Sequence, residues 1–201
     1  VTALLHAVAV VKAGAFAVIR LTYYCLGTNM LSGSWAQTTA VLLTAFTIVF
    51  GSTFALKETN FKRRLAYSTV ANMSYILFGA VLLTPSGLEA GLMHMAAHSC
   101  IKILAFFAAG AVLHMTGRQS IYELDGIGKR MPVTFACYTM AALALTGIPP
   151  FSGFVSKWYL LTGAAQSGGI AYVGAAAILI SAFLTAIYML TIVRRAWFAD
   201  Q

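Results

Sequence analysis

The chain contains six apolar stretches, each long enough to cross the hydrocarbon core of a bilayer, which needs about 20 residues of helix. Of its 201 residues, 60% are hydrophobic and only 9% are charged, whereas about 25% of the residues in a soluble domain are charged. This composition predicts an all-α integral membrane protein with about six transmembrane helices in one bundle. The stretches are residues 2–24, 36–56, 65–84, 88–114, 132–163 and 169–193.

The basic residues between the stretches predict how the chain is oriented. Residues 57–64, residues 115–131 and the C-terminal Arg194 and Arg195 are basic, and they alternate with connections that contain neither lysine nor arginine. Because cytoplasmic connections of membrane proteins are enriched in lysine and arginine, the basic segments are expected on the inner side. The net charge of +8 is then explained by the basic residues that orient the chain in the membrane, and no nucleic-acid partner is expected.

A line of proton-carrying side chains crosses the fourth stretch. His94, His98 and Lys102 are four residues apart, a spacing that places them on one face of a helix. The two histidines could instead be interhelical hydrogen-bond donors. Met93 and Met95 beside His94 could suggest copper, but no second cluster of ligands accompanies them. We favour a proton relay, since histidine titrates near neutral pH and can pass a proton through either ring nitrogen.

Two lysines lie deep in predicted spans. Lys12 and Lys102 are near the centres of the first and fourth stretches, about 15 Å from the headgroups at 1.5 Å per residue, too deep for snorkelling. A charge at this depth costs about 2.5–3.5 kcal/mol. Desolvation also disfavours the ammonium form, so the amine can exchange its proton nearer to neutral pH. We therefore predict proton-transfer roles for both lysines. His6 shares the first stretch with Lys12 but lies on another face, and its role stays open.

The fifth stretch is predicted to contain a broken helix. Gly147, Pro149, Pro150 and Gly153 lie near its middle, and consecutive prolines remove backbone donors and interrupt the helix. Unpaired carbonyls at membrane depth persist only inside protein or beside a water-filled cavity, and broken helices are typical of transport sites. A plain proline kink is the alternative, but Lys157 follows the break closely, which favours a functional interpretation.

No cofactor or metal site is predicted. Cys25, Cys100 and Cys137 are isolated, which indicates packing residues rather than a disulfide or a metal cluster. The chain also contains no GxGxxG motif, so we expect no redox centre in it.

Four motifs in this order resemble the proton-conducting antiporter-like subunits of respiratory complex I, of multi-subunit sodium/proton antiporters and of membrane-bound hydrogenases. The motifs are FKRRLAYSTVANMSYILFG, GLMHMAAHSCIKILAFFAAGAVLHMTG, ELDGIGKRMP and ALTGIPPFSGFVSKWYLL. The opening ALLHAVAVVKAGAFAVIR also fits, closest to the antiporter and hydrogenase branches.

The resemblance implies a fold of about fourteen helices with two inverted five-helix repeats, each containing a broken helix. Residues 1–25 would be the last helix of the first repeat, and residues 36–197 the second repeat. The rest of the first repeat would be missing, so we expect a fragment of a longer subunit that could not pump alone. The motif match implies a role for each site residue. Lys12 would lie at the link between the two half-channels, and Lys157 at the exit half-channel. The central axis would carry His94, His98 and Lys102, and Lys62 matches a basic residue of the first motif to which no definite role is assigned.

The predicted function is proton translocation within an NADH-quinone oxidoreductase (complex I)-type or hydrogenase-type pump. The expected partners are other membrane subunits and the lipid bilayer, in the inner membrane of a bacterial or archaeal cell. The expected transported ion is the proton, with sodium as the alternative. A sodium/proton antiporter subunit and a non-conducting scaffold subunit are the alternatives.

Overall fold

The computed structural model describes residues 9–199, and this part of the chain folds into a bundle of long helices with short helical turns between them. The fold class predicted from the apolar stretches is confirmed, including the discontinuous fifth unit. The elements are α2 (Val10–Arg20), the π-helical η2 (Leu21–Leu26), α3 (Thr28–Leu31), α4 (Trp35–Lys57), α5 (Phe61–Val81), α6 (Pro85–Thr116), the 3-10 turn η3 (Ile121–Glu123), α7 (Ile127–Arg130), α8 (Pro132–Thr146), α9 (Ser152–Ser167) and α10 (Ala171–Phe198).

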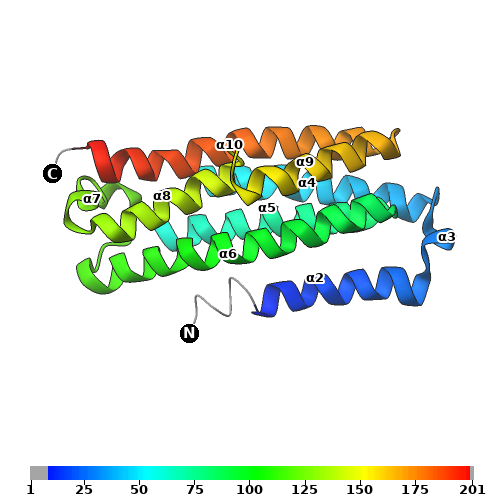
Figure 1. The fold of residues 1–201 in the computed structure, drawn as a ribbon, viewed down its shortest axis with the longest axis horizontal. Coiled ribbons are helices and arrows are strands. Elements are labelled where there is room, and N and C mark those ends of the chain that lie inside the picture. The colour runs from blue at the N-terminus through cyan, green and yellow to red at the C-terminus, as the bar shows by residue number, and fades with distance from the viewer. Residues whose placement is uncertain (1–8, 200–201) are drawn as a thin grey trace.

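Successive long helices run in alternating directions along the bundle, and α8 and α9 together make one crossing (Figure 1). Among the described residues, α4, α6 and α10 are each long and apolar enough to span a membrane. The connections that follow α4 and α6 lie at the same end as the end of α10. The basic segments therefore gather at one end of the bundle, as the positive-inside pattern requires.

Side chains near the helix ends satisfy backbone groups that the helices leave unpaired. The side chains of Ser34, Asn60 and Thr84 accept hydrogen bonds from backbone N–H groups in the first turns of α4, α5 and α6. At the other end of α6, Gly117 adopts a left-handed φ of 68°, the usual C-terminal conformation for glycine. These local signals set the helix boundaries, and burial of the apolar faces stabilises the helices against one another.

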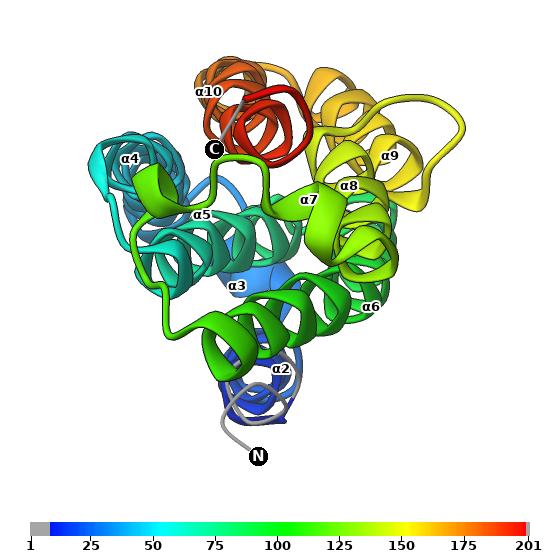
Figure 2. The ribbon, with the colours of Figure 1, turned by 90° about the vertical axis from the view of Figure 1, so that its left-hand side faces the viewer.

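Helix α5 lies inside the bundle, between α4, α6 and α10, and α2 packs on its outer side (Figure 2). Most residues of α5 are buried, including polar ones. By contrast, α4 and α10 expose large apolar side chains on their outer faces, as lipid-facing helices do. These side chains include Leu42, Leu43, Phe46, Phe50, Leu179, Ile180 and Phe183.

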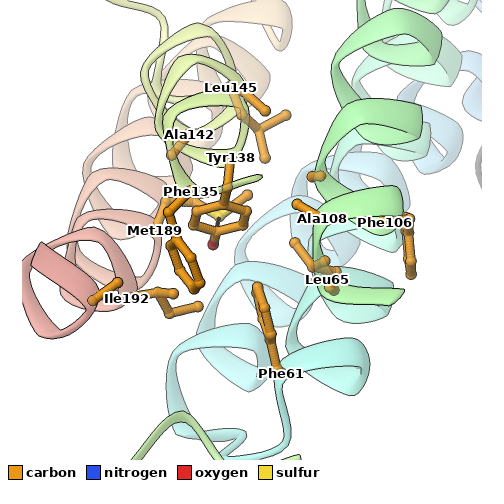
Figure 3. Close-up of a cluster of buried hydrophobic side chains, with 14 of the residues drawn as sticks. Phe61, Leu65, Phe106, Ala108, Phe135, Tyr138, Ala142, Leu145, Met189 and Ile192 are labelled. Atoms are coloured by element: carbon orange, nitrogen blue, oxygen red, sulfur yellow. Dashed lines mark hydrogen bonds between the residues drawn. The ribbon is translucent and has the colours of Figure 1, made fainter. Parts of the chain in front are cut away.

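The largest apolar cluster lies toward the end of the bundle that carries the basic connections, where α5, α6, α8 and α10 meet (Figure 3). Phe61 and Tyr138 pack edge to face with ring centroids 5.2 Å apart. The Tyr138 hydroxyl donates to the sulfur of Met189 at 3.3 Å. This cluster stabilises the packing of these four helices against one another.

Arg64 is 4% exposed and bonds only to backbone carbonyls in the described contacts. Its guanidinium donates to the carbonyls of Glu58 (2.9 Å), Leu56 (3.1 Å) and Tyr188 (3.1 Å). One side chain therefore joins the end of α4 to the body of α10.

Replacing Arg64 with alanine is expected to destabilise the folded subunit by about 3 kcal/mol or more, because each buried carbonyl left without a partner costs about 1–3 kcal/mol. The amount of assembled subunit in membranes and its thermal melting point are the measurements. Arg63→Ala is the matched control, since Arg63 is exposed one position earlier and should tolerate the change. Equal stability of the two variants would contradict a bracing role for Arg64.

Candidate functional site

The break between α8 and α9 is closed by Lys157. Helix α8 ends at Thr146, and α9 begins at Ser152. The Lys157 amine turns back and donates to the carbonyls of Leu145 at 2.7 Å and Thr146 at 3.0 Å. These carbonyls belong to the last turn of α8, where the helix has no N–H of its own to offer them and where the helix dipole favours a positive charge. The predicted break is thus confirmed, and it holds a 6% exposed lysine.

Two glycines let the broken ends approach each other. A Cβ atom on Gly153 would overlap the carbonyl oxygen of Ala144, so no other residue fits at the start of α9. Gly147 has a φ of 91°, and a Cβ there would meet the Lys157 side chain at 3.2 Å. The glycines therefore bring the amine and the end of α8 together.

His94 bridges three helices. Its Nδ1 is 2.9 Å from the Ser156 hydroxyl on α9, and its Nε2 is 3.1 Å from the Asn72 side-chain oxygen on α5. Asn72 donates its amide to the carbonyl of Ser68 at 2.7 Å, which assigns the oxygen to the side facing His94. His94 then donates through Nε2 to Asn72. At Nδ1, the Ser156 hydroxyl either donates to a neutral His94 or accepts from a protonated one, in which case its own hydrogen goes to the Gly153 carbonyl at 3.3 Å.

His98, one turn further along α6, has different surroundings. It is fully buried, and its ring stacks with that of His94 at a centroid distance of 6.0 Å. Within the described residues, neither of its ring nitrogens has a hydrogen-bond partner. Buried polar atoms almost always have a partner, so the two ring nitrogens of His98 are an exception among the polar atoms of the site.

Lys102 is the most deeply buried cation of the site. Its exposure is 0%, and its amine donates to the carbonyl of Leu65 at 2.9 Å and to the Ser68 hydroxyl. The amine also lies 5.9 Å from the centre of the Phe106 ring. All of these partners are uncharged.

Tyr75 connects the broken helix to the histidines. Its ring lies 5.8 Å from the Lys157 amine and 5.2 Å from the centre of the His94 ring. The structure therefore brings Lys157, Tyr75, His94 and His98 into one continuous buried group.

Of the other predicted residues, Lys12 is buried on α2, Lys62 is exposed, and His6 lies outside the described residues. Lys12 is 7% exposed and lies on α2, which packs against α5. Lys62 is exposed at the start of α5, outside the buried group. His6 belongs to the segment before residue 9, which the structure does not describe.

The chain matches a single family description over most of its length. Residues 1–185 match the family described as NADH:quinone oxidoreductase/Mrp antiporter, transmembrane. The chain belongs to this family. The resemblance predicted from the four motifs is confirmed, and the chain is a multi-pass membrane protein of the antiporter-like type.

Curated relatives of this antiporter-like chain include subunits of two dehydrogenases. NADH-quinone oxidoreductase subunit N of Desulforudis audaxviator is 36% identical over 188 residues, covering 92% of this chain and 36% of the relative. F(420)H(2) dehydrogenase subunit N of Methanosarcina mazei is 36% identical over 196 residues, covering 93% of this chain and 39% of the relative. The chain thus spans little more than a third of the length of these relatives.

Solved structures with the same fold come from multi-subunit complexes. A chain of the membrane-bound sulfane sulfur reductase, an archaeal respiratory membrane complex, is 32% identical with a TM-score of 0.87, covering 98% of this chain and 39% of that one. A chain of the Mrp complex from Dietzia sp. is 30% identical with a TM-score of 0.86, covering 94% of this chain and 34% of that one.

Sequence reasoning missed the neutral polar residues of this antiporter-like bundle. Ser68, Asn72 and Tyr75 line one face of α5, and Ser156 precedes Lys157 on α9. Their spacing of four and three residues on α5 is a helical-face signal, like that of the histidines. Single serines and asparagines are common in membrane helices, so the pattern alone did not separate these residues from ordinary packing.

Proposed function

We propose that this chain conducts protons across the membrane as part of a longer antiporter-like subunit. The route uses Lys12, His94, His98, Lys102 and Lys157. The observation that carries the proposal is the full burial of Lys102 in the middle of α6 among uncharged partners. An amine in this position is costly to keep charged and can therefore exchange its proton.

The scarcity of acidic partners supports exchange over a fixed ion pair. The described acidic residues lie at helix ends or in connections, and none is buried; they are Glu58, Glu89, Glu123 and Asp125. A lysine held by a carboxylate would stay charged. Lysines held by carbonyls and hydroxyls can be charged or neutral.

His98 supplies the adaptable step of the route. His94 is held on both sides by Asn72 and Ser156, whereas both nitrogens of His98 are available to water or to a moving proton. Lys102 and His98 lie one turn apart on α6, and charging one of these sites disfavours a proton on the other. The energy would come from redox chemistry in a partner complex or from a sodium gradient.

Replacing Lys157 with alanine in the full-length subunit of the intact complex is expected to reduce proton pumping severely while leaving assembly largely unchanged. The measurement is acidification of inside-out membrane vesicles, normalised to the amount of assembled subunit. Lys157→Arg separates proton exchange from helix capping, because arginine can still donate to the Leu145 and Thr146 carbonyls but stays charged.

Loss of pumping in both Lys157 variants would support a proton-exchange role, and full pumping in Lys157→Ala would remove Lys157 from the route. Recovery in Lys157→Arg alone would assign the lysine a capping role only.

A sodium/proton antiporter subunit is the second candidate, favoured by the likeness to a chain of the Mrp complex. It requires transport that depends on sodium, so replacing sodium with choline in the same vesicles distinguishes the two functions. A non-conducting scaffold would tolerate simultaneous neutralisation of Lys12, Lys102 and Lys157.

A further inference from the structure

The His94 ring is held by two neighbouring rings and at both of its nitrogens. Its centre lies 5.2 Å from that of Tyr75 and 6.0 Å from that of His98, and its nitrogens contact Asn72 and Ser156. A half-turn of the ring would exchange each nitrogen with a carbon atom, so Asn72 and Ser156 would both lose their partner. The two nitrogens therefore have different and fixed surroundings, with Nε2 facing α5 and Nδ1 facing α9.

The side chain of Asn72 can only accept a hydrogen bond from His94. Asn72 is 2% exposed, and its amide nitrogen donates to the carbonyl of Ser68, one turn earlier on α5, at 2.7 Å. In the reversed orientation of the amide, two oxygen atoms that can only accept would face each other at this distance. The side-chain oxygen therefore faces Nε2 of His94 at 3.1 Å, and Nε2 must carry a hydrogen whether His94 is neutral or charged.

The exchangeable proton of His94 is then confined to Nδ1, because an imidazole has only two nitrogens. In neutral His94, Nδ1 accepts from the Ser156 hydroxyl at 2.9 Å. When a proton binds to Nδ1, the new N–H donates to the Ser156 oxygen, and the hydroxyl hydrogen turns to the Gly153 carbonyl at 3.3 Å. Ser156 thus has a partner in both states without gaining or losing a proton itself.

The exchanging nitrogen lies on the side of the broken helix. Ser156 directly precedes Lys157 on α9, and the Tyr75 ring lies 5.8 Å from the Lys157 amine as well as beside His94. On the other side, Nε2 faces an amide oxygen, which does not take up a proton near neutral pH. A proton can therefore join or leave His94 toward α9 but not toward α5.

We infer that Asn72 is a positioning residue that holds His94 in the Nε2–H tautomer, so that a proton binds and leaves this histidine only at Nδ1, beside Ser156 and the broken helix. This inference rests on the proposed function, in which His94 belongs to the route. It gives the two neutral partners of His94 separate tasks, because Asn72 fixes the tautomer and Ser156 adapts to the proton.

The first test determines the tautomer of neutral His94 by nitrogen NMR, in the intact complex labelled with isotope-enriched histidine. The His94 signals are those missing from His94→Gln, in which the amide can still donate to Asn72 but no ring nitrogen can take up a proton. We expect a hydrogen on Nε2 and none on Nδ1. Asn72→Leu should shift neutral His94 toward the Nδ1–H form, since Ser156 then offers the remaining acceptor, whereas Ser156→Ala should keep the Nε2–H form.

The second test measures proton pumping by the same complexes in inside-out vesicles, normalised to the amount of assembled subunit. Asn72→Leu is expected to lower pumping at least about tenfold, the effect of losing one hydrogen bond to a charged group, because charged His94 would have no acceptor at Nε2. Ser74→Ala is the matched control, since Ser74 is also buried on α5 and its hydroxyl donates to the Val70 carbonyl of the same helix at 3.2 Å. It should pump like the unmodified subunit.

A hydrogen on Nδ1 and none on Nε2 in the unmodified complex would overturn the inference, and this measurement does not depend on any Asn72 variant that fails to assemble. An unchanged tautomer or normal pumping in Asn72→Leu, or an equal loss of pumping in Ser74→Ala, would also overturn it. In each of these cases an inactive His94→Gln would leave the proposed function intact. Normal pumping by His94→Gln would remove His94 from the route, and the inference with it.

Discussion

Replacing Lys102 with methionine is expected to lower proton pumping to below about one hundredth of the unmodified rate, since a positioned proton-transfer group contributes roughly 10²–10⁴-fold. Methionine fills a similar volume without the amine, so the packing around Leu65 and Phe106 is kept. Because the change removes a buried charge without removing an acidic partner, the folded bundle should persist. Pumping in inside-out vesicles and the amount of assembled complex are measured together.

Lys57→Met is the control for Lys102→Met. Lys57 is the last residue of α4 and is exposed, so its loss changes the charge of the subunit by the same amount without touching the buried group. We expect unchanged pumping from this variant. If both variants lost pumping equally, the effect would be one of overall charge or topology, and Lys102 would have no special role.

The membrane fold could be predicted from composition because few backbone structures can cross a bilayer. Spans must be helical and apolar, so the run lengths and the basic connections sufficed for the alternating bundle. The double proline predicted the break between α8 and α9 for a similarly local reason. Some helix boundaries were less accurate: the third stretch was expected over residues 65–84, whereas α5 covers Phe61–Val81.

Only the ionisable residues of the candidate site could be predicted from the sequence, because charged residues are rare in apolar stretches and neutral polar residues are common there. Lys102 and His94 could be recognised because burying an ionisable side chain in a membrane costs free energy. Asn72, which orients His94 from α5, and Ser156, which contacts it from α9, become recognisable only when tertiary packing brings them to α6.

Gly153→Val is expected to cause the largest loss of stability among the changes considered, because its side chain has no space at the joint of the broken helix. A Cβ at this position would overlap the carbonyl oxygen of Ala144, and backbone atoms cannot turn aside as a flexible side chain can. Overpacking typically costs about 1–3 kcal/mol, and a backbone clash should cost more than that range. Separation of α9 from α8 would also draw Lys157 away from the Leu145 and Thr146 carbonyls.

The measurements are the yield and the thermal melting point of the intact complex, followed by pumping of whatever assembles. Gly110→Ala is the control, because Gly110 is a membrane glycine of another helix and a Cβ there meets no atom within 4 Å. Alanine favours a helix over glycine by about 1 kcal/mol, so Gly110→Ala should be neutral or slightly stabilising. Gly153→Ala, with the smallest possible side chain, should already be destabilised relative to it. Equal melting points for the two alanine variants would show that the α8–α9 joint yields to an added methyl group and that Gly153 is not required for its closure.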